Sequence, residues 1–240
     1  MSRETPSAAE RLIVALDFAD PHEAADLIVR IGPGVSFFKI GMELAYGGGL
    51  ELAESLVHQG KQVFLDLKLH DIPNSVTRAT RQVARLGVRF LTIHAYPQTI
   101  AAAKAGAAGS GLQLLGVTVL TSYDEHDLAA AGYGLGLRDL VARRGQQVKE
   151  AGIDGLVLSA EEVGAARKAL GPDMILVTPG IRPAGSEKGD QKRVKTPYEA
   201  IAAGADYLVV GRPISEAKDP RATAQAIIAE ISAALASHGR

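Results

Sequence analysis

The stretch FLDLKLHDIP, residues 64–73, has the apolar content of a buried strand, yet it carries Asp66, Lys68 and Asp71 within six positions. Side chains alternate along a strand, so Val63 and the leucines at the following odd positions form one apolar face. Asp66 and Lys68 point the opposite way, about 6.6 Å apart at roughly 3.3 Å per residue. The pattern predicts a strand that packs its apolar face on helices and turns its charges toward an enclosed centre.

Short β-rich runs alternate with segments of helical period, in the order strand then helix, eight times. No linker divides them, so we expect one domain over residues 1–240, an α/β fold of the (β/α)8 TIM barrel type. A Rossmann-type open sheet is disfavoured because the first strand runs into DFADPHEA instead of a glycine-rich turn. The expected strands cover residues 11–17, 37–42, 62–68, 89–95, 113–120, 155–160, 175–181 and 207–214.

The segment NSVTRATRQVARLG, after the third strand, has the period of an amphipathic helix. Val76, Ala79, Val83 and Leu86 fall on one stripe, and Gly87 is placed to end the helix as its C-terminal cap. We expect such helices to fill the gaps between strands and to cover their apolar faces.

The composition is that of a soluble globular protein. Of 240 residues, 47% are hydrophobic and 22% are charged, and the net charge is −1 with both signs scattered along the chain. We expect no nucleic-acid partner, because that requires a basic field, and no membrane association, because no long apolar run occurs. The absence of cysteine excludes disulfides and thiolate chemistry and is compatible with a reducing cytoplasm.

Two connections, residues 121–137 and 182–196, exceed the short loops usual in such units. Both follow strands on the carboxyl face of the barrel, and the second is polar enough to act as a mobile lid. For the first, a decorated surface loop is an equal alternative. Its GYGLGLR segment does not follow a strand, so we interpret it as a flexible connection instead of a phosphate loop.

Charged residues recur at the ends of the first three strands. Asp17 ends the first strand on its inward face, and Lys39 holds the matching place in the second. With Asp66, Lys68 and the nearby Asp71, they bring two cations and three anions to the end of the barrel where barrel enzymes keep their sites. Inert ion pairs, or a helix-capping role for Asp71, remain alternatives.

The last two strands predict a phosphate site. Arg182 and Arg212 follow the seventh and eighth strands together with Gly180 and Gly211, at the corner where barrels often hold a phosphate. Glycine lets backbone N–H groups approach an anion, and a guanidinium can bind two of its oxygens at once. For His70 and His94, neither at metal-ligand spacing, we expect structural hydrogen bonds.

Several motifs in a fixed order resemble one family. FLDLKLHDIPN occurs together with VALD, FKIGMEL, VTVLTS, VTPGIR, GDQKRV and VVGR. In this order they resemble the orotidine 5'-monophosphate decarboxylase family in its bacterial form, from about Leu12 to Pro220. Related sugar-phosphate decarboxylases and aldolases share the DxKxxD core, so the resemblance rests on the ordered set.

The resemblance implies decarboxylation of orotidine 5'-monophosphate (OMP) to UMP and CO2, in pyrimidine biosynthesis, with no cofactor and no metal. Lys39, Asp66, Lys68 and Asp71 would form a charge network beside the reacting carbon, and Lys68 would protonate C6. Asp71 and Ile72 would reach into the site of a second subunit. A homodimer with shared sites is therefore implied.

The resemblance also implies which residues hold the substrate. Ser75 stands where the family usually has Thr, facing the partner's site, and keeps the hydroxyl, so we expect little effect. The ribose hydroxyls would bind Asp17 and Lys39, the pyrimidine Thr121 and Pro179, and the phosphate Arg182, Gly211, Arg212 and the lid residue Gln191.

Two other functions stay open. The related 3-keto-gulonate 6-phosphate decarboxylase and hexulose-phosphate synthase group uses a divalent metal and has Glu where this chain has Lys39. A cation at that place disfavours a metal ion. A non-catalytic nucleotide-binding barrel is the other alternative.

Overall fold

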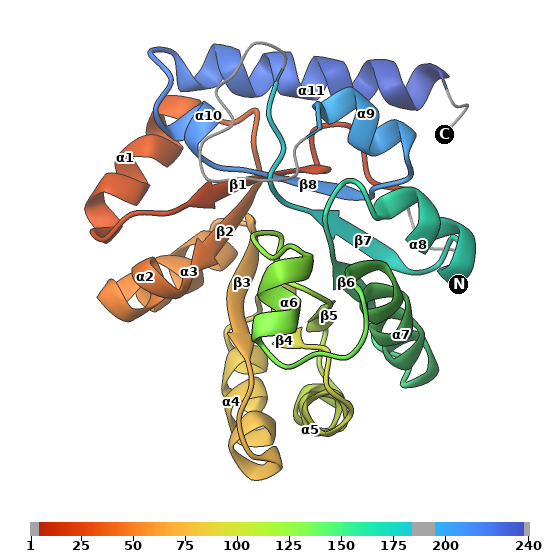
Figure 1. The fold of residues 1–240 in the computed structure, drawn as a ribbon. Helices are drawn as coiled ribbons and strands as arrows, with labels where there is room; N and C mark the ends of the chain where they lie inside the picture. The colour runs from red at the N-terminus through yellow and green to blue at the C-terminus, as the bar shows by residue number, and fades with distance from the viewer. Residues whose placement is uncertain (1–4, 184–194, 238–240) are drawn as a thin grey trace.

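A computed structural model describes residues 5–183 and 195–237 of the chain. Eight parallel strands pair in sequence order, and β1 pairs with β8, which closes the sheet into a barrel (Figure 1). The predicted (β/α)8 barrel is confirmed. The strands are β1 Leu12–Leu16, β2 Phe37–Gly41, β3 Gln62–Leu69, β4 Phe90–His94, β5 Gln113–Val117, β6 Gly155–Val157, β7 Ile175–Thr178 and β8 Tyr207–Val210.

Helices ring the barrel (Figure 1). Proline stands at the first position of α1, α4, α5 and α9, where its fixed φ fits and its missing N–H is not needed. Gly87 follows α4 with a φ of 71°, as predicted for a C-terminal glycine. The helices are α1 Pro21–Ile31, α2 Met42–Leu44, the π-helical η1 Ala45–Gly49, α3 Leu50–His58, α4 Pro73–Arg85, α5 Pro97–Ala107, α6 Glu125–Ala130, α7 Leu137–Glu150, α8 Val163–Leu170, α9 Pro197–Ala202, α10 Arg212–Ser215 and α11 Pro220–Ser237.

Two apolar layers follow the alternation of side chains along the strands. Outward-facing residues such as Val63 and Leu65 pack on the helices, and Leu67 and Leu69 lie partly buried against the same layer, as predicted. The barrel interior is filled by the opposite faces of the strands. This inner layer contains Ile13, Ala15, Phe37, Phe64, Phe90, Leu115, Val117, Val157, Ile175, Val177, Tyr207 and Val209.

The stripe predicted on α4 is partly wrong. Val76 and Val83 are buried, but Ala79 and Leu86 are only half-buried, and Thr80 is the fully buried residue of the helix face. The reason is that α4 packs against α5 as well as against the strands, which rotates its buried face toward Thr80.

Seven strands end before their predicted carboxyl ends, and β5, β6, β7 and β8 end at least three residues early. The segment 118–120 after β5 leaves the sheet although Thr118 and Val119 are buried, and residues 212–214, expected as strand, begin α10. An apolar run in the sequence predicts that residues are buried, but residues form a strand only where a neighbouring strand also supplies hydrogen bonds. The apolar runs therefore continue past the sheet into buried loops.

The first long connection contains a helix that the sequence analysis did not predict. Asp124 and Asp127 form a capping box at the start of α6, each carboxylate accepting from the other's backbone N–H. Glu125 then accepts from the backbone N–H of Leu137 and ties α6 to α7. The segment 121–137 is thus a structured cover over the carboxyl end near β5, as Figure 1 shows.

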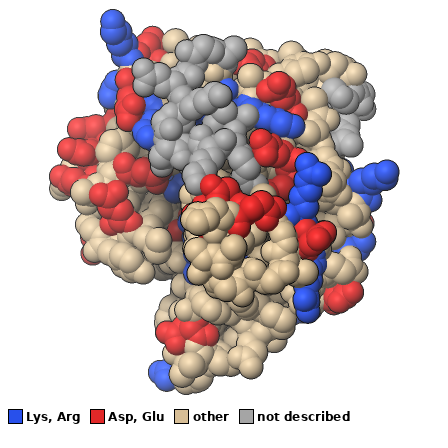
Figure 2. Space-filling model, in the orientation of Figure 1, with Lys and Arg blue, Asp and Glu red and all other residues tan. Residues whose placement is uncertain are grey.

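The surface carries both signs of charge. On the face in Figure 2, Lys and Arg side chains are interspersed with Asp and Glu, as expected from the sequence. Within residues 5–183 and 195–237, none of the helices combines the length and the apolarity that crossing a bilayer requires.

Candidate active site

A cavity of about 190 Å³ opens at the carboxyl ends of the strands. Most of the strand-borne residues that line it stand two positions after a residue of the inner apolar layer, so they share its inward direction. The pairs are Ala15 and Asp17, Phe37 and Lys39, Phe64 and Asp66, Val177 and Pro179, and Val209 and Gly211.

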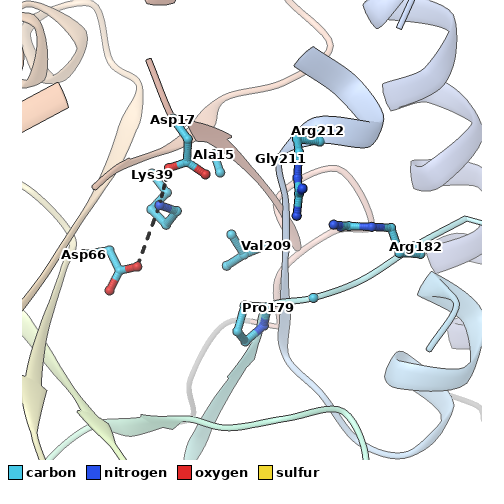
Figure 3. A pocket seen from close by; sticks show the side chains of 10 residues that line it. Ala15, Asp17, Lys39, Asp66, Pro179, Arg182, Val209, Gly211 and Arg212 are labelled. Carbon is cyan, nitrogen blue, oxygen red and sulfur yellow. Dashed lines mark hydrogen bonds and ion pairs between the residues drawn. The ribbon is translucent and has the colours of Figure 1, made fainter. Parts of the chain in front are cut away.

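One wall of the cavity is an ion-pair chain. The Lys39 ammonium lies 2.8 Å from Asp17 Oδ1 and 3.7 Å from Asp66 Oδ2 (Figure 3). The other oxygen of Asp66 lies 2.9 Å from the Lys68 ammonium. Exposed side-chain fractions are 10% for Lys39, 16% for Asp66 and 27% for Lys68, against 61% for Asp17. Asp66 therefore sits between two ammonium groups in a poorly solvated place, where ion pairs are strong.

Asp66 is ionised in this setting. Burial by itself would raise the pKa of its carboxyl group, but the charges of Lys39 and Lys68 and hydrogen bonds from Lys68 and Thr92 outweigh burial. The net effect lowers the pKa of Asp66. The ionised carboxylate can therefore pair with the Lys68 ammonium.

The backbone of Lys68 is unusual. Its φ is 48°, and in the described part of the chain it is the one non-glycine residue with a positive φ. The register between β3 and β4 shifts at this place, with Leu65 opposite Leu91 and Leu69 opposite Ile93. Such backbone strain costs about 1–3 kcal/mol and gathers at functional sites. The pairing with β4 is therefore interrupted by a bulge before Leu69, although Leu67 and Leu69 stay with the outward layer and Lys68 stays on the side of Asp66, as predicted.

Thr92, on β4, was missed by the sequence analysis. Its hydroxyl accepts from the Lys68 backbone N–H and donates to Asp66 Oδ1, both at 2.9 Å. The available signal was a polar residue in the inward phase of the strand FLTIH, two positions after Phe90.

The opposite wall carries guanidinium groups. Arg182 and Arg212 face the ion-pair chain across the cavity, with Pro179 and Val209 between the two walls (Figure 3). Gly180, with a φ of 75°, also lines the cavity. Sequence analysis predicted this pairing of two arginines with glycines after β7 and β8, and the structure brings them together.

The two arginines stand close enough to repel one another. Burial and then the charge of Arg212 lower the pKa of Arg182, while Glu216 acts in the opposite direction. A guanidinium remains charged at neutral pH even so. Two partly buried like charges at one wall favour a doubly charged anion as the ligand of that wall.

Asp71 and Ile72 lie outside the ion-pair chain. The Asp71 carboxylate accepts from the Ile72 backbone N–H at 2.6 Å and forms no salt bridge with the residues that the structure describes. It does not cap α4, whose N-cap is Ile72. Asp71 is exposed, and Ile72 is 66% exposed, large for an apolar side chain. Ser75 lies half-buried in the first turn of α4.

Several predicted site residues do not line the cavity, among them Lys68, Ile72 and Ser75. Thr121 is half-buried in the loop between β5 and α6 and does not line the cavity. Gln191 falls outside the described residues, as does the part of the predicted lid from residue 184 to residue 194. At the edge of that segment, Arg182 donates its backbone N–H to the Lys195 carbonyl.

The two histidines near β3 and β4 differ in their contacts. His70 places Nδ1 2.9 Å from Thr99 Oγ1 and stacks on Tyr96, so its predicted structural hydrogen bond is confirmed. His94 packs against His70, and its imidazole forms no hydrogen bond within the described residues, so that prediction is wrong. Burial, His70 and Arg144 lower the pKa of His94, which keeps it neutral at pH 7.

Across residues 5–183 and 195–237, no three side chains of His, Cys, Asp or Glu gather in a way that could hold a metal ion. The donor set at the cavity also opposes one, because the Lys39 ammonium occupies the space between Asp17 and Asp66.

The protein is a (β/α)8 barrel, and its polar site lies at the carboxyl ends of the strands, where an ion-pair chain faces two arginines. The chain belongs to the orotidine 5'-phosphate decarboxylase / HUMPS family, whose model matches residues 10–227. The resemblance drawn from the sequence motifs is therefore confirmed at the level of the family.

Individual relatives carry the name of the same family. The chain is 63% identical to an orotidine 5'-phosphate decarboxylase of Bradyrhizobium sp. strain BTAi1. The alignment of 231 residues covers 96% of this chain and 95% of the relative. It is 57% identical to an enzyme of the same name from Afipia carboxidovorans, over 98% of this chain and 100% of the relative. The crystal structure of orotidine 5'-phosphate decarboxylase from Lactobacillus acidophilus superposes with a TM-score of 0.82 at 37% identity, over 92% of this chain and 99% of that chain.

Proposed function

We propose that this chain decarboxylates OMP to UMP and CO2 without a cofactor, as a step of pyrimidine nucleotide synthesis. One observation carries the proposal beyond family membership. Lys39 and Asp66 face two guanidinium groups across a single cavity, and Asp66 also pairs with Lys68. A nucleotide monophosphate has a dianion at one end and a reacting ring at the other, and it matches these two walls.

The chemistry explains the need for a fixed cation. Loss of CO2 from C6 leaves an electron pair in an sp2 orbital that the ring π system cannot absorb. An ammonium group about 4 Å from that pair is worth on the order of 4 kcal/mol at an effective dielectric of 20. In the proposal Lys68 provides this charge, because its ammonium pairs with Asp66 at 2.9 Å and is held in place. Lys68 then donates its proton to C6 and completes UMP.

Asp66 has a second part in the proposal. Its ionised carboxylate faces the substrate carboxylate, and that repulsion is relieved as CO2 leaves. Lys39, held between Asp17 and Asp66, fixes the carboxylate and meets the ribose hydroxyls together with Asp17.

The phosphate end supplies binding energy at a distance from the chemistry. Arg182, Arg212 and the Gly211 backbone would bind the phosphate at the arginine wall, and Gln191 would join them from the lid. Thr121 and Pro179 would contact the pyrimidine. Binding energy gained at the phosphate then orients the ring and serves the chemical step.

The site is proposed to be completed by a second copy of the chain. Asp71 and Ile72 stand exposed beside the site without joining its ion pairs, and an exposed isoleucine is suited to an apolar contact between subunits. In a symmetric homodimer, Asp71 of each subunit would approach Lys68 of the other, with Ser75 facing the same site. A cytoplasmic location goes with this proposal.

Mixing two inactive variants tests the shared site. Lys68→Ala and Asp71→Ala subunits should each be inactive alone and regain activity when mixed, because one of the two sites in a hybrid dimer is intact. Random exchange makes half of the dimers hybrid, so about a quarter of wild-type activity is expected. No recovery, although labelled subunits exchange, would remove the shared site.

Turnover of OMP in the presence of EDTA tests the activity itself. Loss of substrate absorbance at a rate independent of EDTA supports the proposal. Metal-dependent action on a sugar phosphate would instead identify the metal-using branch of the family. Binding of UMP without turnover of OMP would identify a nucleotide-binding barrel.

A further inference from the structure

The β3–β4 pair is interrupted where the proposed chemistry takes place. Three residues of β3, Asp66 to Lys68, lie between the pairs Leu65–Leu91 and Leu69–Ile93, whereas β4 places only Thr92 between them. The bulge pushes Lys68 into the left-handed conformation, with a φ of 48°. A lysine adopts that conformation rarely, so a neighbouring group must hold it there.

Thr92 is the residue opposite the bulge, and it is fully buried. Its hydroxyl accepts from the Lys68 backbone N–H, which replaces the ladder hydrogen bond that the bulge removes. The same hydroxyl donates its only proton to Asp66 Oδ1. One oxygen atom therefore fixes both the backbone of Lys68 and the carboxylate that pairs with the lysine's ammonium.

The second contact sets the direction of Asp66. With Oδ1 bound by Thr92 and Lys68, Oδ2 is turned toward Lys39 at 3.7 Å. A carboxylate free to rotate would sample other orientations and change the distances to both ammonium groups. The hydroxyl also stabilises the ionised form of Asp66, whose pKa it helps to lower.

We propose that Thr92 is a positioning residue, which acts on the reaction by holding Lys68 in its left-handed conformation and Asp66 in its ion-pairing orientation. The inference rests on the proposed decarboxylation at Lys68. Thr92 does not line the cavity, so its effect passes through these two residues. A displacement of about 1 Å at reacting groups can lower a rate by about 100-fold, which sets the expected scale.

Three substitutions separate the hydroxyl from the packing. Thr92→Ser keeps the hydroxyl and loses the methyl, Thr92→Ala loses both, and Thr92→Val keeps the shape and loses only the hydroxyl. The control is Thr80→Val on α4, because Thr80 is also fully buried and its hydroxyl has no hydrogen-bond partner among the described residues.

The readouts are kcat and KM for OMP, the Kd for UMP, and the pH dependence of kcat. Thr92→Val and Thr92→Ala should lose about 100-fold in kcat, with the Kd for UMP within about 3-fold of wild type. Thr92→Ser and Thr80→Val should stay within about 3-fold in kcat. The acid limb of the kcat profile should move to higher pH in Thr92→Val, because Asp66 loses a hydrogen bond to its ionised form.

The ranking of the Thr92 variants by kcat tests the positioning role even if one variant is unstable. Thr92→Ser and Thr92→Ala differ only in the hydroxyl, so their comparison isolates it. Equal kcat in these two, or a kcat of Thr92→Val above that of Thr92→Ser, would overturn the positioning role. An inactive wild-type protein would instead overturn the proposed function, so the two failures are distinguishable.

Discussion

Both ends of the barrel hold cations that are at least partly buried, and the groups around those cations differ in charge. At the amino end, the Arg89 guanidinium lies 5.1–5.6 Å from the ring centres of Phe37, Phe90 and Tyr207. It also donates to the side chains of Gln62, Gln113 and Tyr207. The groups that contact this guanidinium are neutral, and the acidic group that its charge affects is Glu10, whose pKa is lowered by hydrogen bonds from Ser7 and then by the charge of Arg89. Arg89 thus lies at the base of the barrel.

At the carboxyl end, the cations are paired with carboxylates and face a cavity. Lys68 stands on a strained backbone, and Arg182 and Arg212 stand close enough to affect one another's charge. The amino end surrounds its cation with aromatic rings and neutral polar side chains, whereas the carboxyl end keeps its charges beside a cavity. From this difference we expect the amino end to contribute mainly to stability and the carboxyl end to the proposed chemistry.

The largest expected effect comes from removing the ammonium at the carboxyl end. Lys68→Ala should lower kcat for OMP by about 1000-fold or more, since about 4 kcal/mol of charge stabilisation corresponds to that factor. Binding of UMP should persist. Lys61→Ala is the control, because Lys61 donates to the Val35 carbonyl at the amino end. Comparable kcat for Lys68→Ala and wild type would refute the proton-donor role.

The reverse pattern is expected at the amino end. Arg89→Ala should lower the free energy of unfolding by about 2–4 kcal/mol, because it leaves a cavity under three aromatic rings and unpaired glutamine side chains. Urea denaturation measures this change, and kcat per folded molecule should stay near wild type. Arg85→Ala, on the exposed side of α4, is the matched control. Loss of activity without loss of stability would contradict the division between the two ends.

The arginine wall offers a comparison within the carboxyl end. Arg182→Ala should lower kcat/KM for OMP by about 10- to 100-fold, since a hydrogen bond to a charged group is worth about 1.5–3 kcal/mol. The nucleoside orotidine has no phosphate, so the variant and the wild type should process it at the same rate. A similar loss with orotidine would show that Arg182 acts on the ring instead of the phosphate.

The smallest expected effect is a pH dependence of stability from His94. The unfolded chain takes up a proton at this residue near pH 6.5, but folded His94 has a lowered pKa and resists protonation. Its stabilising contribution is complete above about pH 6.5 and is lost as the pH falls toward its folded pKa.

His94→Gln should therefore flatten the fall in unfolding free energy between about pH 6.5 and 5. The groups that face His94 are His70, Arg144, Lys68 and Asp66, and none of them is altered by this change. Urea denaturation at several pH values measures the slope, with His58→Gln on α3 as the surface control. An unchanged slope for His94→Gln would mean that another group carries the acid sensitivity.

Local patterns in the sequence were enough to predict much of the site. Alternation along each strand placed Asp17, Lys39 and Asp66 inside, because a period of two holds wherever a strand is regular. It could not predict the bulge before Leu69, since bulges arise from the pairing of two strands. Alternation along β4 could have marked Thr92 as inward-facing, but its place opposite the bulge depends on strand pairing.

Other features depended on contacts between distant segments. Capping residues Asp124 and Asp127 could have revealed α6, but the apolar run after β5 obscured where the strand ended. The three rings around Arg89 come from β2, β4 and β8, and no local pattern relates them.

The sequence by itself determined the eight strand–helix units, the inward charges of the first three strands and the arginine–glycine pairs after the last two, because each follows from local periodicity or local composition. Tertiary structure alone decided that Thr92 lies opposite the bulge at Lys68, and that the two arginines face Lys39 and Asp66 across one cavity. It also decided that Asp71 forms no ion pair with the residues that the structure describes. These depend on the register and closure of the sheet, which are fixed only when all eight strands pair.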